Sequence, residues 1–296
     1  MRIRGMRHRS WLGPAAVMAL ALASTGATCR GAGTHGADPV RDVDLPGVDT
    51  HDFTPRERHE FSEYVSELPA PCPTIAVPIA ECLIGKRPCG ACATAAVAIA
   101  KAVRNGMTSE QVHSLYKERF DVASARSIPL DGSPSRGPEG APVVVVEFAD
   151  FECPFCQKLA TELDQKWEAR KDRLRFVFKF LPLSMHHHGE IAARAAIAAQ
   201  MQGKFWEMHR QLFANGQHLE EDDLVGYARA IGLDIDRFRA DMASAPATER
   251  IEADRKLADS LGVKGTPTLF VDGHECDLRG DDIGEWLDEE LSARKR

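Results

Sequence analysis

The chain has 296 residues, of which 44% are hydrophobic and 27% are charged, and its formal net charge is −7 at pH 7. This length and composition allow ordinary apolar cores in two modest domains, which excludes a disordered protein. Basic side chains form a block only at the extreme N-terminus, and no face dense in Lys and Arg is expected elsewhere. A nucleic-acid-binding protein is therefore excluded as well.

The N-terminus has the order of a secretory signal. A basic start is followed by the apolar stretch Trp11 to Ala23 and then by small residues. The apolar stretch is shorter than the roughly 20 residues that span a bilayer. We therefore expect residues 1–28 to be a signal peptide and the protein to be exported, with an uncleaved signal anchor as the alternative.

Cys29 follows this segment and precedes the flexible run Arg30-Gly31-Ala32-Gly33-Thr34. Its place resembles the lipidated first residue of a bacterial lipoprotein, although Gly26-Ala27-Thr28 departs from the usual pattern. Lipidation of Cys29 and plain cleavage both stay open, and a lipid anchor is the only membrane contact expected. Residues 29–52 are rich in Gly, Asp and Pro without an apolar period, which predicts a flexible tether.

Residues 53–126 predict a small helical module, arranged as a helical hairpin. An alanine-rich helix is expected over residues 93–103 and ends at Asn105-Gly106, a good C-terminal cap. The run Thr108-Ser109-Glu110-Gln111 is a capping box and begins the next helix.

The module also carries four cysteines: Cys72, Cys82, Cys89 and Cys92. In an exported protein they predict two disulfides that stabilise a module with a small core. Cys89-Gly90-Ala91-Cys92 also opens a helix, so a second redox pair stays open, as does a four-cysteine zinc site. No His follows Cys92, so covalent haem attachment is not indicated. Cys276 is left as an odd cysteine if Cys29 is lipidated.

Residues 127–141 contain three Pro and three Gly and predict a linker. From Pro142 the pattern changes to strand, helix and strand, then to several helices, and finally to a strand, a turn, a return strand and a last helix. The first strand, helix and strand are expected at 143–148, 154–170 and 174–180. The later helices are expected at 190–202, 204–214, 221–231, 237–244 and 248–261. The last strand and helix are expected at 268–271 and 281–291.

Cys153-Pro154-Phe155-Cys156 stands between the apolar strand and an amphipathic helix pattern. A strand that leads into C-x-x-C at a helix start places the first sulfur near unpaired N–H groups and the positive end of the helix dipole. Both features stabilise a thiolate. The motif predicts a redox dithiol, with a structural disulfide or metal site as the alternative.

A second motif lies more than a hundred residues later, in Gly265-Thr266-Pro267-Thr268. Its proline stands where thioredoxin-fold proteins hold a cis peptide, and the two motifs together resemble the DsbA-like branch of the thioredoxin superfamily. The stretch from Gln202 to His209 extends the resemblance, which covers residues 142–296. It implies an α/β thioredoxin fold with an inserted helical subdomain, preceded by the cysteine-containing module, and a short first strand near Ser127 to Leu130.

The resemblance also implies roles for individual residues. Cys153 would be the exposed nucleophile, and Cys156 the buried thiol that resolves the mixed disulfide. Glu147 matches a buried acid six residues before the first cysteine; strand alternation puts it on the core face with Val143 and Val145, and it would accept the proton of Cys156. Lys179 is a candidate charge partner for this acid.

For substrate binding, a cis Pro267 would place the backbone of Thr266 beside the sulfurs, where the family pairs it with an extended peptide. Phe155 lacks the donor that a histidine would offer to the thiolate. The stretch His186-His187-His188 is more typical of a polar turn than of a metal site, and the aromatic side chain of Trp206 is expected in the helical core.

The sequence therefore predicts an exported thiol–disulfide oxidoreductase of a bacterial periplasm or cell envelope. Its expected partners are cysteine-containing envelope proteins and a membrane or soluble redox partner. No cofactor and no resident metal are expected, and the direction of electron transfer stays open. The rivals are a metal-binding protein that uses the dithiol with His186 to His188, and an envelope scaffold with locked cysteines.

Overall fold

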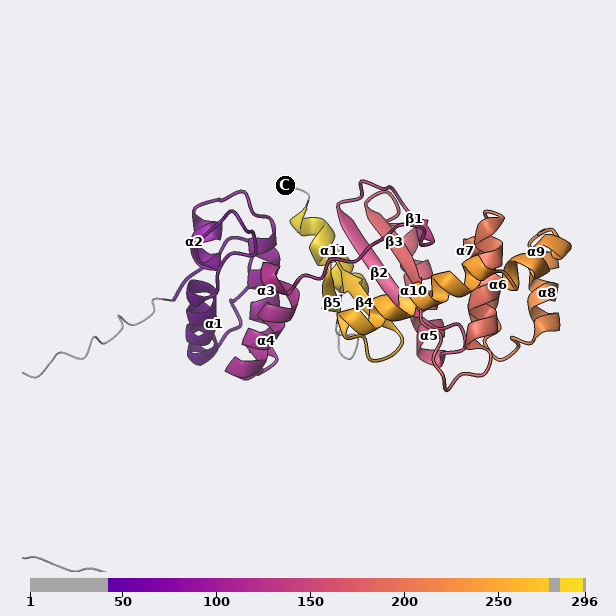
Figure 1. Ribbon diagram of the computed structural model, residues 1–296. Coiled ribbons are helices and arrows are strands. Elements are labelled where there is room, and N and C mark those ends of the chain that lie inside the picture. Colours follow the sequence, from indigo (N-terminus) through magenta and orange to yellow (C-terminus); the bar gives the residue numbers. More distant parts are fainter. Residues whose placement is uncertain (1–41, 277–282, 295–296) are drawn as a thin grey trace, which may run out of the picture. The chain divides into compact units, whose positions relative to one another are not determined.

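The computed structural model describes residues 42–276 and 283–294 (Figure 1). The predicted signal peptide, Cys29 and the first part of the tether lie outside these residues. Within the described ranges, every helix is too short or too polar to cross a membrane.

The N-terminal module contains four helices rather than a hairpin. They are α1 (Pro55–Glu67), α2 (Ile79–Ile84), α3 (Ala91–Arg104) and α4 (Ser109–Arg119), followed by the short 3-10 helix η1 (Val122–Ser124). The two caps predicted around α3 and α4 are present: Asn105 is the C-cap of α3, and Thr108 forms a reciprocal capping box with Gln111. An equivalent box at Thr54 and Glu57 begins α1.

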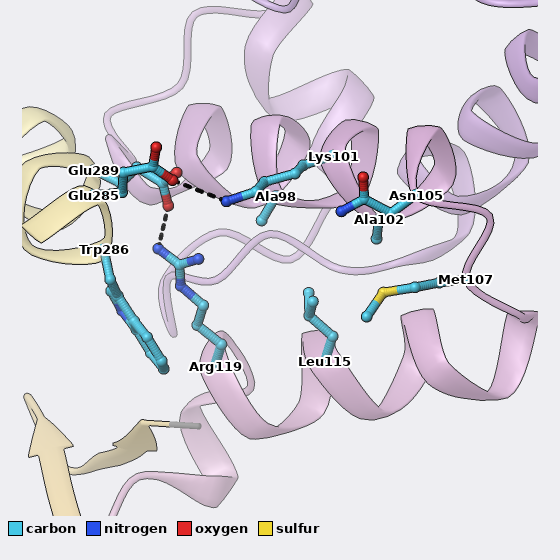
Figure 2. A pocket seen from close by; sticks show the side chains of 10 residues that line it. All are labelled: Ala98, Lys101, Ala102, Asn105, Met107, Leu115, Arg119, Glu285, Trp286 and Glu289. Atoms are coloured by element: carbon cyan, nitrogen blue, oxygen red, sulfur yellow. Dashed lines mark hydrogen bonds and ion pairs between the residues drawn. The ribbon is translucent and has the colours of Figure 1, made fainter. Parts of the chain in front are cut away.

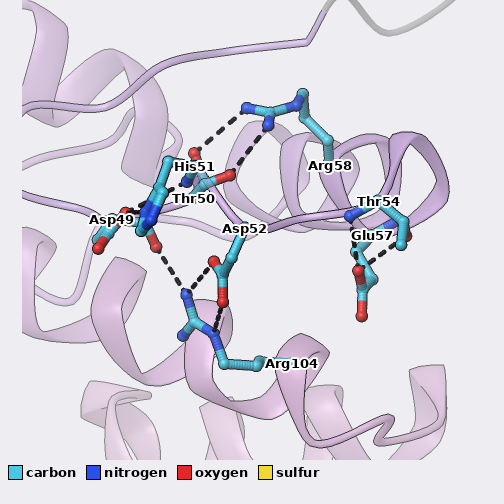
Figure 3. A network of polar contacts seen from close by, with 8 residues as sticks. All are labelled: Asp49, Thr50, His51, Asp52, Thr54, Glu57, Arg58 and Arg104. Carbon is cyan, nitrogen blue, oxygen red and sulfur yellow. Dashed lines mark hydrogen bonds and ion pairs between the residues drawn. The ribbon is translucent and has the colours of Figure 1, made fainter.

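The segment before α1 packs against the module, which differs from the tether predicted up to residue 52. Leu45 is buried in the module core. The guanidinium group of Arg104 donates to the carboxylate of Asp52 at 2.9 Å and to the carbonyl oxygen of Asp49 at 2.9 Å (Figure 3). The buried Leu45 side chain and the hydrogen bonds from Arg104 of α3 therefore hold residues 42–52 against the module.

A five-stranded mixed sheet forms the centre of the following region, in the order β1-β3-β2-β4-β5. Its strands are β1 (Ser135–Arg136), β2 (Val143–Ala149), β3 (Leu174–Phe180), β4 (Thr268–Val271) and β5 (His274–Cys276). Strands β2 and β3 are parallel, and the other pairs are antiparallel. Because β2 is central and buried on both faces, its sequence is a nearly continuous apolar run.

Helices cover both faces of this sheet. Leu159 and Leu163 of α5 (Pro154–Trp167) and Leu287 of α11 (Ile283–Ala293) pack with β2, β3 and β4 on one face. On the other face, Ala258 of α10 (Ala245–Leu261) packs with Phe148. Between β3 and β4 the chain inserts α6 (Gly189–Met201), α7 (Phe205–Ala214), α8 (Glu221–Ala230), α9 (Ile235–Met242) and α10. The predicted fold class, a thioredoxin-like sheet with an inserted helical subdomain, is confirmed.

The first strand lies later than predicted, at Ser135–Arg136 and not at Ser127 to Leu130. Ile128 and Leu130 instead pack as partly buried side chains against the core beneath α10. Pro129 between them has no N–H to donate to a strand ladder, which disfavours pairing there.

Arg136 of β1 is held by aromatic rings. Its guanidinium carbon lies 4.2 Å from the ring centre of Trp167 and 4.7 Å from that of Trp206, and its Nη2 lies 2.7 Å from Asp164 Oδ1. Such cation–π contacts gain strength when they are desolvated. They fix a strand that has only two residues.

Charged pairs join α11 to the module (Figure 2). Lys101 Nζ lies 3.0 Å from Glu285 Oε2, and Arg119 bonds to Glu289 while its guanidinium carbon lies 4.5 Å from the ring centre of Trp286. A pocket of ≈ 60 Å³ remains between these side chains.

Candidate active site

Cys153 stands at the junction of β2 and α5. It is the N-cap of α5, with Pro154 at the first helical turn, and its N–H donates to the carbonyl oxygen of Asp150 at 3.1 Å. Its Sγ lies 3.4 Å from the carbonyl oxygen of Thr266, to which the thiol donates. The strand–helix placement predicted from the motif is therefore present.

The surroundings of Cys153 favour its thiolate. The Cys156 thiol donates to the Cys153 sulfur, and so do the backbone N–H groups of Cys156 and Phe155. These hydrogen bonds outweigh the effect of burial and lower the Cys153 pKa to about 5. At neutral pH the sulfur is therefore ionised in the reduced protein.

The resemblance led us to expect an exposed nucleophile, but Cys153 is only 4% exposed. The Thr266 carbonyl covers the sulfur from one side. The next large side chain in the motif, Phe155, is 71% exposed. Between the two buried cysteines, Pro154 and Phe155 are therefore the exposed residues of the motif.

Cys156 lies one turn further along α5 and is fully buried. Burial, its hydrogen bond to Cys153 and the nearby charge of Glu147 all raise the pKa of this thiol. The two cysteines are therefore unlike: one is a thiolate at neutral pH, and the other is a thiol that donates to it.

Glu147 is fully buried in β2. It pairs in register with Phe178 and Leu269, so it shares the sheet face of Val145 and α5. Among the described residues, neither of its carboxylate oxygens has a hydrogen-bond partner. Burial, opposed by the positive charge of Arg136, raises the pKa of Glu147 to about 8. An acid of this kind can hold or release a proton near neutral pH.

Lys179 is not the charge partner of Glu147. It pairs in register with Phe148, whose side chain lies on the opposite face of β2, and its Nζ lies 3.3 Å from Asp254 Oδ1 of α10. The two sides of a strand alternate, so an acid at 147 and a lysine opposite position 148 face away from each other.

The predicted proline loop is next to the dithiol. The Thr266–Pro267 peptide bond is cis, and β4 begins at the following residue. The loop thus presents the backbone of Thr266 to the Cys153 sulfur.

The sequence reading missed a buried carboxylate beside the motif. Asp150 is 1% exposed and accepts hydrogen bonds from the N–H groups of Glu152 at 2.9 Å and Leu183 at 2.7 Å, and its Oδ2 lies 2.7 Å from His186 Nδ1. A Cβ at Gly189 would lie 2.7 Å from Asp150 Oδ1, so only glycine fits. An Asp side chain that accepts a hydrogen bond from the N–H two residues later is a common turn signal. The contact between Asp150 and Glu152 could therefore have been predicted from the sequence.

The three consecutive histidines do not converge on one point. His186 bonds to Asp150, whereas His188 Nε2 lies 3.0 Å from Glu220 Oε1. In the described part of the chain, two triplets have metal-like spacing: Cys82, Cys89 and Cys92, and Asp49, His51 and Asp52. The first triplet is in disulfides and the second has the Arg104 guanidinium on Asp52, so we assign a metal to neither.

The helical subdomain closes over the dithiol with an aromatic core. Phe205 and Phe213 are buried, and Trp206, which the sequence predicted in this core, packs against it at partial burial. His209 lies among these rings at 2% exposure, and burial lowers its pKa to about 3. The imidazole is therefore neutral and acts as part of the core.

The four cysteines of the module form two disulfides, Cys72–Cys89 and Cys82–Cys92. Cys89 and Cys92 are therefore each oxidised, but not with each other. Cys276 of β5 takes part in neither bond and is buried in the sheet core with Leu269.

Comparison with known proteins places the sheet-containing region in a family. A family model described as thioredoxin matches residues 130–289, more than half of the chain. The crystal structure of a thioredoxin-like oxidoreductase from Silicibacter pomeroyi matches with a TM-score of 0.50 and 30% identity, over 56% of this chain and 94% of that one. A thiol–disulfide exchange protein from Wolbachia pipientis, alpha-DsbA2, matches with a TM-score of 0.49 and 21% identity, over 64% of this chain and 97% of its own.

Among curated proteins, relatives that match about half of this chain are named as Na(+)/H(+) antiporters. The chain is 45% identical over 139 residues to Na(+)/H(+) antiporter NhaA 3 of Salinispora tropica, which covers 47% of this chain and 21% of the antiporter. It is 41% identical over 161 residues to the NhaA antiporter of Herminiimonas arsenicoxydans, over 54% of this chain and 25% of the antiporter. The chain thus spans about a quarter or less of the length of these relatives.

Proposed function

Because the chain belongs to the thioredoxin family, we propose that it is an exported, DsbA-like thiol–disulfide oxidoreductase that exchanges disulfides with protein cysteines through Cys153 and Cys156. The observation that carries this proposal is the unequal pair of sulfurs. The pKa of Cys153 is lowered to about 5, and that of Cys156 is raised by burial. Exchange needs one thiolate that attacks and one thiol that is held in reserve.

In the reductive direction, the Cys153 thiolate attacks a substrate disulfide. A mixed disulfide forms between Cys153 and one substrate sulfur, and the other substrate sulfur leaves as a thiolate. Cys156 then loses its proton, attacks Cys153 and releases the substrate as a second thiolate. The oxidative direction is the reverse of these steps.

Glu147 supports the second step. The thiolate charge of Cys153 contributes to the raised pKa of Glu147, and it disappears when the mixed disulfide forms. Loss of that charge lowers the pKa of Glu147, so more of the group is in the carboxylate form that can accept a proton. The same charge also raises the pKa of Cys156, so its loss makes the Cys156 proton easier to remove. Glu147 is thus the proposed proton acceptor for Cys156.

The proposed substrate is an extended peptide that carries a cysteine or a disulfide. The Thr266 backbone, 3.4 Å from the Cys153 sulfur, offers main-chain pairing to such a peptide, and the exposed ring of Phe155 offers an apolar contact. Main-chain hydrogen bonds do not depend on the side chains of the bound peptide. Such pairing therefore suits an enzyme with many protein substrates.

The proposed location is the periplasm or envelope of a bacterium, with envelope proteins as substrates and a separate redox partner. It is supported by the signal-like N-terminus and by the presence of two disulfides, which persist in oxidising compartments. N-terminal mass spectrometry of the mature protein would distinguish plain cleavage, lipidation at Cys29 and an uncleaved anchor.

A trapping experiment tests the proposal. In a Cys156→Ser variant the nucleophile remains and the resolving thiol is gone, so mixed disulfides with envelope proteins should accumulate on non-reducing gels. The matched control is the Cys153→Ser, Cys156→Ser variant, which should lack the adducts that form through Cys153. Absence of adducts from a folded Cys156→Ser protein with a reduced Cys153 would contradict the proposal and favour a binding or scaffold role.

A further inference from the structure

The module's cysteines lie apart from its main core. The core of α1, α3 and α4 is built from side chains such as Phe61, Ile99 and Val112 and contains no cysteine. The four sulfurs form a second, smaller cluster with Ala70 and Ile75. The main apolar core of the module is packed without these cysteines, so the disulfides can have a role other than packing that core.

The two disulfides are close enough to exchange with each other. The sulfurs of Cys82, Cys89 and Cys92 all lie within 4.8 Å of one another. Cys89 is bonded to Cys72, while Cys82 and Cys92 are bonded to each other. A thiolate released at Cys89 would therefore lie beside both sulfurs of the other bond.

The four cysteines differ in burial. Cys72 is partly buried, whereas Cys82, Cys89 and Cys92 are buried. An incoming thiolate would thus meet Cys72 first.

Charge favours Cys89 as the leaving group of that attack. It precedes the 14-residue helix α3 by two positions. A helix N-terminus stabilises a thiolate, and a stabilised thiolate leaves faster.

We propose that these four cysteines are a second thiol–disulfide exchange site, in which Cys72 receives an incoming thiolate and Cys89 passes the exchange on to the Cys82–Cys92 disulfide. In the first step a bond forms between the incoming sulfur and Cys72, and Cys89 leaves with the electron pair. In the second step Cys89 attacks Cys82, and Cys92 leaves as a thiolate and takes up a proton from water.

A second incoming thiolate then releases Cys72 from its mixed disulfide. The two thiols that entered leave as one disulfide, and the module keeps two electrons, as thiols at Cys72 and Cys92 and a Cys82–Cys89 bond. Cys92 is the favoured leaving group of the internal step because it lies in the first turn of α3. Cys82 follows Glu81 in α2 and lacks that stabilisation. This site is independent of the function proposed for Cys153 and Cys156.

The test uses the full chain with Cys153→Ser and Cys156→Ser, which leaves the module intact. The further substitution Cys72→Ser removes the disulfide partner of Cys89, so the module can begin directly with the internal step. The three remaining cysteines, Cys82, Cys89 and Cys92, then contain one disulfide and one thiol. After acid quenching and alkylation, tandem mass spectrometry should find at least tenfold more label on Cys92 than on Cys89. Label that stays on Cys89, or that appears on Cys82, would overturn the proposal.

A second arm keeps all four cysteines and so does not depend on the folding of the Cys72→Ser variant. Reduced glutathione, a small thiol, is added in slight excess to the Cys153→Ser, Cys156→Ser protein. The expected product carries glutathione on Cys72 and a thiol on Cys92. Glutathione on another module cysteine, or reduction only after the protein unfolds, would contradict the assignment.

Discussion

The molecule contains two C-x-x-C motifs at helix starts, and their cysteines have different bonding partners. Cys153 and Cys156 of α5 lie close enough to share a hydrogen bond and are both reduced, whereas Cys89 and Cys92 of α3 each bond to a cysteine outside the motif. The motif at α5 follows a buried central strand. The motif at α3 follows a loop that carries Cys72 and the short helix α2 that carries Cys82, and these two cysteines are bonded to the cysteines of the motif. A helix start with two cysteines is thus not enough to define a reactive pair, because neighbouring cysteines decide the pairing.

The largest expected effect separates the two motifs by turnover. Cys153→Ser should abolish reduction of insulin disulfides, because no other cysteine among the described residues combines a lowered pKa with a place beside the Thr266–Pro267 loop. Cys72→Ala, Cys89→Ala should keep at least half of the wild-type rate. Insulin turbidity assays on both proteins check this. Normal turnover by the Cys153→Ser protein would show that the active site lies elsewhere in the chain.

The second prediction compares thiolate content. In the reduced protein, absorbance at 240 nm should rise with a midpoint near pH 5, since hydrogen bonds lower the pKa of Cys153 to about 5. The ordinary thiol value is about 8.5, so at pH 6 the thiolate fraction differs by more than two orders of magnitude. Cys153→Ser should remove this transition. A midpoint above pH 7.5 would contradict the description of the site.

Glu147→Gln tests the buried acid. The folded pKa of about 8 is above the ordinary value of 4.5, so the stability that this group contributes is complete below pH 4.5 and is lost as the pH rises through 8. At 1.36 kcal/mol per pKa unit, this shift corresponds to about 4–5 kcal/mol. The oxidised wild-type protein should lose less than that across this window, because the Cys153 thiolate that contributes to the raised pKa is absent there. The variant should lose still less, and its disulfide exchange should be slower by about 10²-fold.

Urea unfolding of the oxidised proteins from pH 5 to pH 9 measures the stability effect, and using oxidised protein removes the titration of Cys153. Parallel curves for wild type and Glu147→Gln would show that Glu147 does not titrate in this range. An unchanged exchange rate would leave Glu147 with a structural role only.

The smallest expected effect concerns the stability of the module. The Cys72–Cys89 disulfide joins residues 17 positions apart, and loop-closure entropy assigns such a bond about 3 kcal/mol. Cys72→Ala, Cys89→Ala should lower the free energy of unfolding by about that amount. Denaturant titrations of the variant and of wild type, both oxidised, provide the measurement. A loss below about 0.5 kcal/mol would leave the bond without a stabilising role.

The residues around the dithiol were largely predictable from the sequence, because their signals are local. A valine-rich strand, C-x-x-C at a helix start and Gly-Thr-Pro-Thr each specify a neighbourhood, and the structure brings Cys153 and Thr266 together. The strand period also placed Glu147 on the same face as Val145.

Features that depend on contacts between distant segments were not predictable. Lys179 was assigned to the wrong face because the register of β3 against β2 is not visible in either strand alone. Four cysteines allow three pairings, and spacing does not choose among them. The bond between Asp150 and His186 joins residues 36 positions apart, and no local pattern announces it.

The arginines that lie over indole rings give the protein a built-in optical signal. Within the described residues, every tryptophan has such a neighbour: Arg136 lies over Trp167 and Trp206, and Arg119 over Trp286. Emission from the first two rings reports on the attachment of β1 to the sheet, and emission from Trp286 reports on the contact between α4 and α11. A Trp286→Phe variant would separate the two signals, so that loosening of the strand and loosening of the helix contact can be followed independently in one fluorescence experiment.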